Sequence, residues 1–197
     1  VINQFGSTIT GGTINTTGSG KLVAFNSGGN FLDGVTLGGT LDMAGGTGIE
    51  RIVGGLTFAN NATINIGANS SLAPQGVQTF SGSGSIVFAD NSGSNRFNVE
   101  AGTLTLASGI TVRGGNGVIG NQSFVGGAAT LTNNGTISAD ETGRAITLTV
   151  NGTLNNNGTL SALNGGTLNI DNSVVGGAGS QILAGAGSVV NQNGVTL

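Results

Sequence analysis

Short segments in which polar and apolar residues alternate recur along the whole chain. The segments 40–43, 63–66 and 103–106 each place apolar side chains at the second and fourth positions, and Thr, Asn or Asp at the first and third. A period of two is typical of a β-strand with one buried face. Between the segments lie Gly-Gly, Asn-Gly and Asn-Asn pairs, which provide tight turns and left-handed backbone positions. The pattern therefore predicts many short strands joined by turns.

One ten-residue sequence occurs twice, at an offset of 23 residues. Residues 130–139 read TLTNNGTISA and residues 153–162 read TLNNNGTLSA, so eight of ten positions are identical. Like residues one period apart suggest coils that stack on one another. In list form, the predicted strands of the first coil are 130–133, 136–139 and 147–150, and those of the next are 153–156, 159–162 and 167–170.

A looser four-residue unit, Thr or Ser followed by an apolar residue, extends this period over the chain. Its copies begin at residues 13, 40, 63, 85, 103, 123, 147, 167 and 188, a mean step of about 22 residues. Three short strands in each period predict an all-β, single-stranded parallel β-helix (β-solenoid) of about nine rungs over residues 1–197. Right-handed winding is the default for parallel crossovers. Leu37, Phe58 and Phe80 should stack in its interior, and Asn side chains at the turns should form amide ladders.

The composition removes several classes of function. Gly accounts for 40 of 197 residues but Pro for only one, which excludes collagen. The chain has no Cys and no His, so it lacks disulfides, thiolate ligands and the commonest metal ligand. A net charge of −3 excludes the basic stripe of a nucleic-acid binder. No apolar run approaches the roughly 18 residues of a membrane-spanning helix. We expect no cofactor, no nucleic-acid partner and no membrane insertion.

The first residues of the four-residue units form the candidate surface. The strongest members are Thr13, Thr40, Thr63, Thr103, Thr147 and Thr167, which are predicted to form one outward ladder of hydroxyl groups. Two parallel threonine ranks on a flat side would suit ice binding. Among these units only 103–105 and 147–149 read Thr-x-Thr. Because Thr is common on exposed strand faces in general, the sequence favours the structural interpretation over ice binding.

Acidic residues give a rival hypothesis, a carbohydrate-binding or polysaccharide-degrading domain built around Asp33, Asp42 and Glu50. Glycoside cleavage generally needs a pair of carboxyl groups. Lys21 and Asp42 lie 21 residues apart and are predicted to pair on neighbouring rungs. The absence of Trp and Tyr weighs against a sugar site. A glycine-rich stretch near Gln181 has an amide where a calcium-binding repeat needs Asp, so we predict no metal site and no catalytic residue.

The repeat style resembles that of a known class of bacterial proteins. The units Asn-Asn-Gly-Thr-Ile/Leu at 133–137 and 156–160, the Gly-Gly-Thr-Leu starts and the absence of Cys resemble the passenger regions of type V secreted adhesins. These are the autotransporters and the filamentous-haemagglutinin-like proteins. The resemblance implies an extracellular rod at the bacterial cell surface, without catalytic residues. It further implies a segment of a longer chain or filament, whose partners are copies of itself end to end, flanking β-helix segments, and host or matrix glycans.

Overall fold

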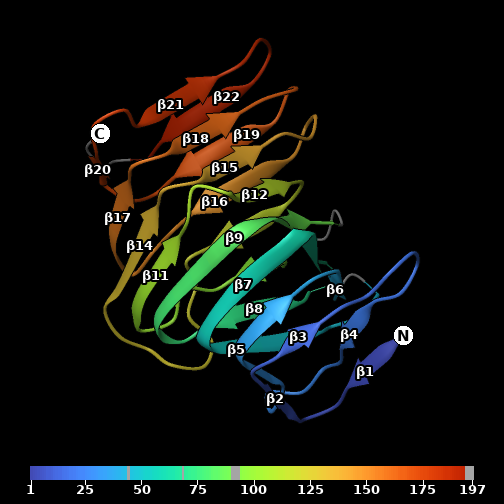
Figure 1. The fold of residues 1–197 in the computed structure, drawn as a ribbon. Helices are drawn as coiled ribbons and strands as arrows, with labels where there is room; N and C mark the ends of the chain where they lie inside the picture. The colour runs from blue at the N-terminus through green and yellow to red at the C-terminus, as the bar shows by residue number, and fades with distance from the viewer. Residues whose placement is uncertain (44, 68, 90–93, 194–197) are drawn as a thin grey trace.

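The chain folds as a parallel β-solenoid. The computed structural model describes residues 1–43, 45–67, 69–89 and 94–193, and in these ranges it contains strands and no helix. The coil makes about eight turns of about 23 residues each. The predicted fold class is therefore confirmed, with slightly fewer and longer turns than the nine of 22 residues that the sequence suggested. Figure 1 shows the coils stacked from the N-terminal end to the C-terminal end.

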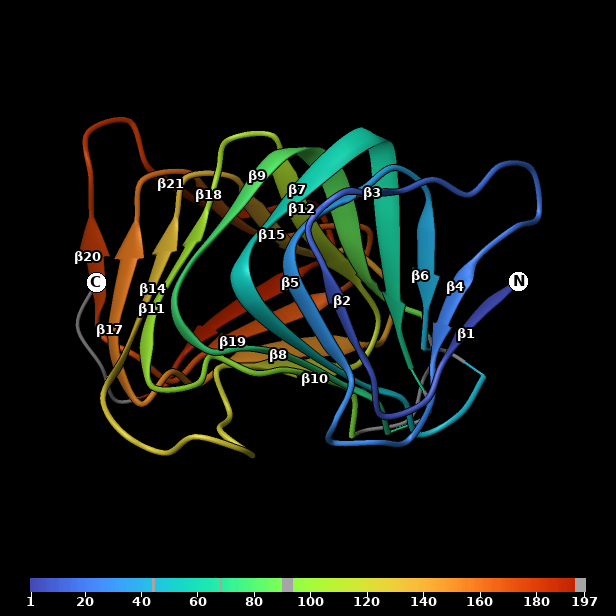
Figure 2. The same cartoon turned by 60° about the horizontal axis from the view of Figure 1, so that its bottom comes forward.

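Each turn contributes one strand or strand segment to each of three faces, which we name A, B and C (Figures 1 and 2). Face A contains β1 (Ile2–Gln4), β4 (Leu22–Ala24), β6 (Thr40–Asp42), the end of β7 (Ile49–Ile66), the end of β9 (Gly76–Phe88), β12 (Ile110–Gly114), β15 (Thr136–Ala139), β18 (Thr159–Ala162) and β21 (Gln181–Ala184). Face B contains β2 (Thr8–Thr10), the start of β5 (Phe31–Leu37), the start of β7, β8 (Ser71–Pro74), β10 (Arg96–Phe97), β13 (Gly117–Ile119), β16 (Ala145–Leu148), β19 (Thr167–Ile170) and β22 (Val189–Gln192). Face C contains β3 (Thr13–Ile14), the end of β5, the middle of β7, the start of β9, β11 (Gly102–Leu106), β14 (Ala129–Asn133), β17 (Gly152–Asn156) and β20 (Val174–Gly176).

The repeated ten-residue sequence stacks on itself. Thr130 pairs with Thr153 between β14 and β17, and Thr136 pairs with Thr159 between β15 and β18. The predicted strand 147–150 is wrong by two residues, because β16 covers Ala145–Leu148 and aligns Ala145 with Thr167. This alignment places Ile146 on Leu168 in the interior, so both coils keep it filled.

Apolar residues of successive coils lie directly above one another inside the stack. On face A the column Leu41, Ile64, Ile86, Val112, Ile137 and Leu160 is fully buried. Burial of each such side chain contributes about 1.5–3 kcal/mol. Leu37 aligns with Phe58 as predicted, but a register shift after Phe58 aligns Phe80 with Leu56 instead. The Phe58 and Phe80 rings still pack together, with centroids 6.0 Å apart.

Asparagine side chains form the predicted amide ladder at the corner between faces C and A. Asn133 Nδ2 donates to Asn156 Oδ1 at 2.8 Å, and both side chains are buried. Outside them, Asn157 Nδ2 donates to Asn134 Oδ1 at 2.9 Å. These bonds satisfy polar groups that the repeat would otherwise leave buried without partners.

One connection leaves the coil. Residues 120–128, between β13 and β14, run along the outside of the stack as the yellow loop low in Figures 1 and 2. We call this segment the strap. Its backbone pairs with the preceding turn, since Val99 N donates to Asn121 O at 3.2 Å and Ala101 N to Val125 O at 3.0 Å.

Candidate functional site

The six threonines predicted to form one ladder are divided among the three faces. Thr13 and Thr103 lie on face C, Thr40 and Thr63 on face A, and Thr147 and Thr167 on face B. Only Thr40 and Thr63 are stacked on each other. The reason is that Thr-first alternating units occur in all three strands of a turn, so the unit does not identify the face.

Face A carries a longer hydroxyl rank than the sequence indicated, but a single one. Its members, in stacking order, are Thr40, Thr63, Ser85, Thr111, Thr136 and Thr159. Two positions further along the strands, the outward residues are Asp42, Asn65, Val87 and Arg113. This second column mixes two charges, an amide and an apolar group, so face A has no regular two-dimensional pattern.

Face C carries two adjacent threonine columns, which we call the threonine face. One column is Thr103, Thr130 and Thr153, and the other is Thr79, Thr105 and Thr132. The two columns are two residues apart along each strand, so their side chains point outward together. The sequence hid this arrangement because 103–105 and 130–132 lie 27 residues apart, a step lengthened by the strap.

The threonine face has defined borders. Towards the N-terminal coils the column position of Thr79 falls on Gly55, and a hollow of about 330 Å³ opens there. Gly54 and Gly55, with φ of 67° and 83°, line this hollow. A left-handed backbone without a side chain interrupts the array, so the flat part extends from β9 to β17.

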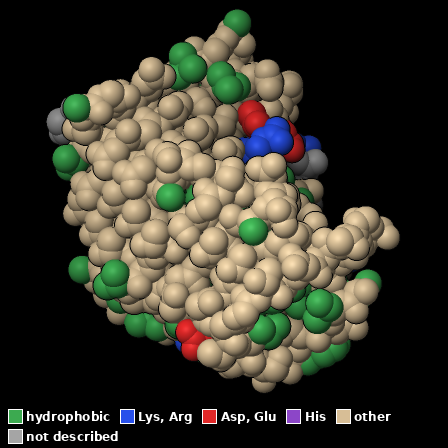
Figure 3. All heavy atoms as spheres, in the orientation of Figure 1, with side chains coloured by type: hydrophobic (Ala, Val, Ile, Leu, Met, Phe, Trp, Pro, Cys, Tyr) green, Lys and Arg blue, Asp and Glu red, His purple; other side chains and the backbone are tan. Residues whose placement is uncertain are grey.

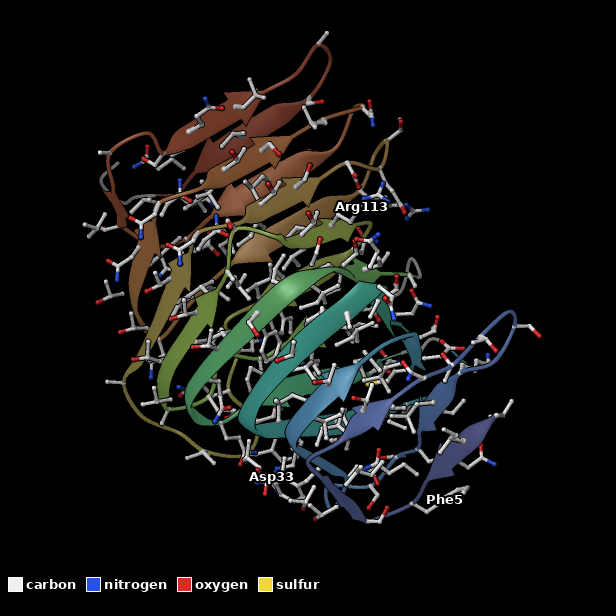
Figure 4. The ribbon with its side chains drawn as sticks, in the orientation of Figure 1. Phe5, Asp33 and Arg113 are labelled. Atoms are coloured by element: carbon white, nitrogen blue, oxygen red, sulfur yellow. The ribbon has the colours of Figure 1, made fainter. Side chains whose placement is uncertain are left out.

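The carboxyl groups considered for a carbohydrate site do not come together. Asp42 on face A forms the predicted ion pair with Lys21. Asp33 lies on face B, near the lower edge of the molecule in Figure 4. Glu50 points into the interior and is 0% exposed. The three side chains therefore offer no pair of carboxyl groups flanking one cleft.

A cavity adjoins the Lys21–Asp42 pair. Its volume is about 340 Å³, and its lining includes Lys21, Phe25, Asn26 and Asp42. The exposed ring of Phe25 stacks on that of Phe5, with centroids 4.1 Å apart and planes inclined by 19°. Sequence reasoning missed this aromatic pair because Phe5 and Phe25 lie outside the repeated units.

Glu50 is buried without a hydrogen-bond partner for either carboxyl oxygen among the described residues. Its neighbour in the next coil is Leu72. Desolvation raises the pKa of Glu50 to about 9. The backbone N–H of Arg51 opposes this only in part, since that N–H donates to the Asn30 carbonyl. At neutral pH the side chain is therefore a protonated acid inside the core.

Glu100 is buried too, but it holds the strap. Its Oε1 accepts from the backbone N–H of Ser123 at 2.9 Å, and its Oε2 from that of Val125 at 2.8 Å. The Phe124 N–H lies 3.3 Å from Oε1 and 3.2 Å from Oε2. Asn98 Nδ2 adds a bond of 3.0 Å. One side chain thus fixes three consecutive strap residues.

The strap also reaches across to earlier coils. The Phe124 ring lies 4.9 Å from the Arg51 guanidinium carbon, and the Phe31 ring lies 4.3 Å from it on the same residue. Arg51 further donates to Gly28 O and to Gln75 Oε1, each at 2.9 Å. The strap therefore joins coils that are separated along the stack.

At the opposite edge of the molecule, Arg113 Nε lies 2.7 Å from Asp140 Oδ2, and Gly114 N donates to Asp140 Oδ1 at 3.0 Å. Figure 4 shows Arg113 well separated from Asp33 and Phe5. The charged groups form isolated pairs on different coils. In the described residues no cluster of three or more Asp or Glu side chains could hold a metal ion.

The described part of the chain has no helix of the length and apolar character needed to cross a membrane. No protein-family model, curated protein or solved structure matches the chain. The fold class, a parallel β-solenoid, is what the structure establishes, and the surfaces described above are the basis for a functional proposal.

Proposed function

We propose that this chain is a non-catalytic structural segment of an extracellular rod, a stalk or filament-forming part of a bacterial surface adhesin. The repeat style that resembles type V secreted passengers supports this proposal. The dispersed carboxyl groups support it as well, because they offer no paired acid and base. In a solenoid each coil is a template for the next, so such a segment needs no cofactor to fold.

The observation that carries the proposal is the open interior at the last described coil. Ile182 is 39% exposed although it points inward, whereas Leu160 directly beneath it is 0% exposed. Val190, above the fully buried Leu168, is likewise only partly buried. Covering these side chains with another coil would remove apolar surface from water and pair the edge of the sheet. We propose that a further β-solenoid coil, from a second copy or a flanking segment, stacks there.

Light scattering over a range of concentrations, with negative-stain microscopy of the same samples, tests this stacking. We expect association that grows with concentration and particles elongated along the coil axis. Ile182→Asp should reduce the association, because a charge would replace the apolar contact. Val77→Asp is the matched control, since Val77 is 81% exposed in the middle of the stack. A monomer at every concentration, or equal effects of both changes, would contradict the proposal.

Glycan binding is a second candidate, favoured by the Phe5–Phe25 ring pair beside the cavity at Lys21 and Asp42. An exposed ring next to charged hydrogen-bonding groups is a plausible sugar platform in chemical terms. Glycan arrays with the wild type, Phe25→Ala and Asp42→Ala test it, with Arg113→Ala as the control at the opposite edge. Binding that is lost in the first two variants and kept in the third would support it. Binding unchanged by Phe25→Ala would reject this site.

A further inference from the structure

We propose that the threonine face binds ice. This proposal rests on the stacking register of β9, β11, β14 and β17, and it does not depend on the rod function proposed above. The register aligns Thr79 with Thr105 and Thr105 with Thr132 in one column. It aligns Thr103 with Thr130 and Thr130 with Thr153 in the other.

The two columns form a regular lattice of hydroxyl groups. Neighbouring threonines in one strand are two residues apart, or about 6.6–6.8 Å, and neighbouring coils are about 4.7–4.9 Å apart. Both repeats are of the size of the oxygen–oxygen repeats on the faces of hexagonal ice. A surface that presents hydroxyls at these spacings can hold water molecules in an arrangement that continues into the crystal.

The array is rigid before any ligand arrives. Thr is β-branched, so its side chain has few rotamers on a strand. Thr103, Thr105, Thr130 and Thr132 are each half-buried by their neighbours. Binding therefore orders little that was previously mobile, and preorganisation of this kind favours affinity over a wide, weakly interacting surface.

The chemistry of the face combines hydroxyl and apolar groups and excludes charge. Each Thr offers one donor, two acceptor lone pairs and a methyl group. Val77, aligned with Thr103, is 81% exposed and continues the column with an apolar side chain. At the other border Asn155 Nδ2 lies 3.5 Å from Thr132 Oγ1. The columns contain no Asp, Glu, Lys or Arg, which would hold their own hydration shells and disorder the adjacent water.

The space-filling view agrees with this description. In Figure 3 the red and blue atoms gather at two edges, near the positions that Figure 4 labels Arg113 and Asp33, and the broad front surface between them is almost free of charge. Face A provides an internal comparison, because its single hydroxyl rank runs beside Asp42 and Arg113. Of the two hydroxyl-bearing faces, only the threonine face repeats in two directions.

Crystalline polysaccharide is the other ordered solid with regularly spaced hydroxyls. Proteins that bind polysaccharides generally use aromatic rings as a platform, and the threonine face has none in its two columns. The observations therefore favour ice, and adsorption to cellulose or chitin becomes an outcome of the test.

The test is thermal hysteresis together with ice-crystal shaping and inhibition of ice recrystallisation, measured on the chain of residues 1–197. We expect faceted crystals and measurable hysteresis for the wild type. The double change Thr105→Lys and Thr132→Lys should abolish both, because two charges then interrupt the central coils. The matched control, Thr63→Lys and Thr111→Lys on face A, should keep them. Circular dichroism and thermal unfolding confirm that both double variants are folded.

A gain-of-function variant keeps the test independent of folding losses. Val77→Thr extends the column of Thr103 by one coil, so hysteresis should rise if the array is the binding surface. Absence of hysteresis and crystal shaping in the wild type would overturn the proposal. Equal losses from the changes on face A and on the threonine face would overturn it too. So would adsorption to cellulose or chitin without any effect on ice.

Discussion

Glu50 and Glu100 are the same residue type at nearly the same burial, yet their surroundings differ completely. Glu50 is 0% exposed and Glu100 is 1% exposed. Glu50 has no hydrogen-bond partner among the described residues, whereas Glu100 accepts from Asn98 and from three consecutive backbone N–H groups. The comparison teaches that donors, and not burial alone, decide what a buried carboxyl group does in this fold.

The origin of the difference is the way a solenoid uses its backbone. In the stacked strands each N–H is already bonded to the neighbouring coil, so an inward side chain such as Glu50 finds no spare donor. The strap leaves the coil, and the N–H groups of Ser123, Phe124 and Val125 are therefore available to Glu100. Regular coils thus tolerate apolar interiors best, while an excursion from the coil can satisfy a buried acid.

Removal of the Glu100 acceptor should have the largest effect. Glu100→Ala leaves three backbone N–H groups without their partner, at about 1–3 kcal/mol for each buried unsatisfied group. Allowing for water that reaches a released strap, we expect a loss of about 4 kcal/mol in the free energy of unfolding. Urea unfolding and amide hydrogen exchange at residues 123–125 measure it. Glu100→Gln, which keeps one carbonyl acceptor, should lie between the two, and a loss below about 1 kcal/mol for Glu100→Ala would refute this account.

The opposite change is expected at Glu50, with a defined pH dependence. Its pKa is 4.5 ordinarily and about 9 in the folded chain, so folding takes up a proton between these values. The stability contribution is complete below pH 4.5 and is lost as the pH rises towards 9, at about 1.4 kcal/mol per pH unit. Glu50→Gln removes this loss, and we expect a stabilisation of about 3 kcal/mol at pH 7 relative to the wild type.

Unfolding of the wild type, Glu50→Gln and Glu50→Leu at pH 5, 7 and 8.5 checks the sign. The gap between the wild type and either variant should widen as the pH rises. The Leu variant removes the buried polar group as well, so it should be the more stable of the two. A gap that is constant with pH would show that the folded Glu50 titrates near its ordinary value.

How much of this could be predicted depends on the residue. The stacked repeat at 130–139 and 153–162 indicated the coil and its period directly, because identical residues one period apart align in the structure. Alternation also carried the orientation of Glu50, which shares parity with the buried Ile52 in β7. The strap carried no such signal, since the donors that hold Glu100 are backbone groups. The threonine face escaped prediction because the length of the strap changed the step between its coils.

The second attachment of the strap should matter less than Glu100. Phe124→Ala removes one ring from Arg51 and leaves the Phe31 ring in place. We expect a loss of about 1 kcal/mol, typical of an exposed cation–π contact with some packing. Phe31→Ala is the matched control, because it removes the other ring without touching the strap. Hydrogen exchange at residues 123–125 should increase only in Phe124→Ala, and an equal increase in both variants would argue against a direct contact.

The smallest effect is expected where the carboxyl group has a charged partner in water. The Arg113 side chain is 48% exposed and that of Asp140 is 11% exposed. Solvent screens such a pair, so Arg113→Ala should cost about 0–1 kcal/mol and less at high salt. Asp140 also keeps its bond from Gly114 N, which the change does not remove. Urea unfolding at low and high salt measures the effect, with Arg113→Lys as the control that keeps the charge. A loss as large as that of Glu100→Ala would mean that charge pairing, rather than backbone donors, is the main device by which this solenoid holds its carboxyl groups.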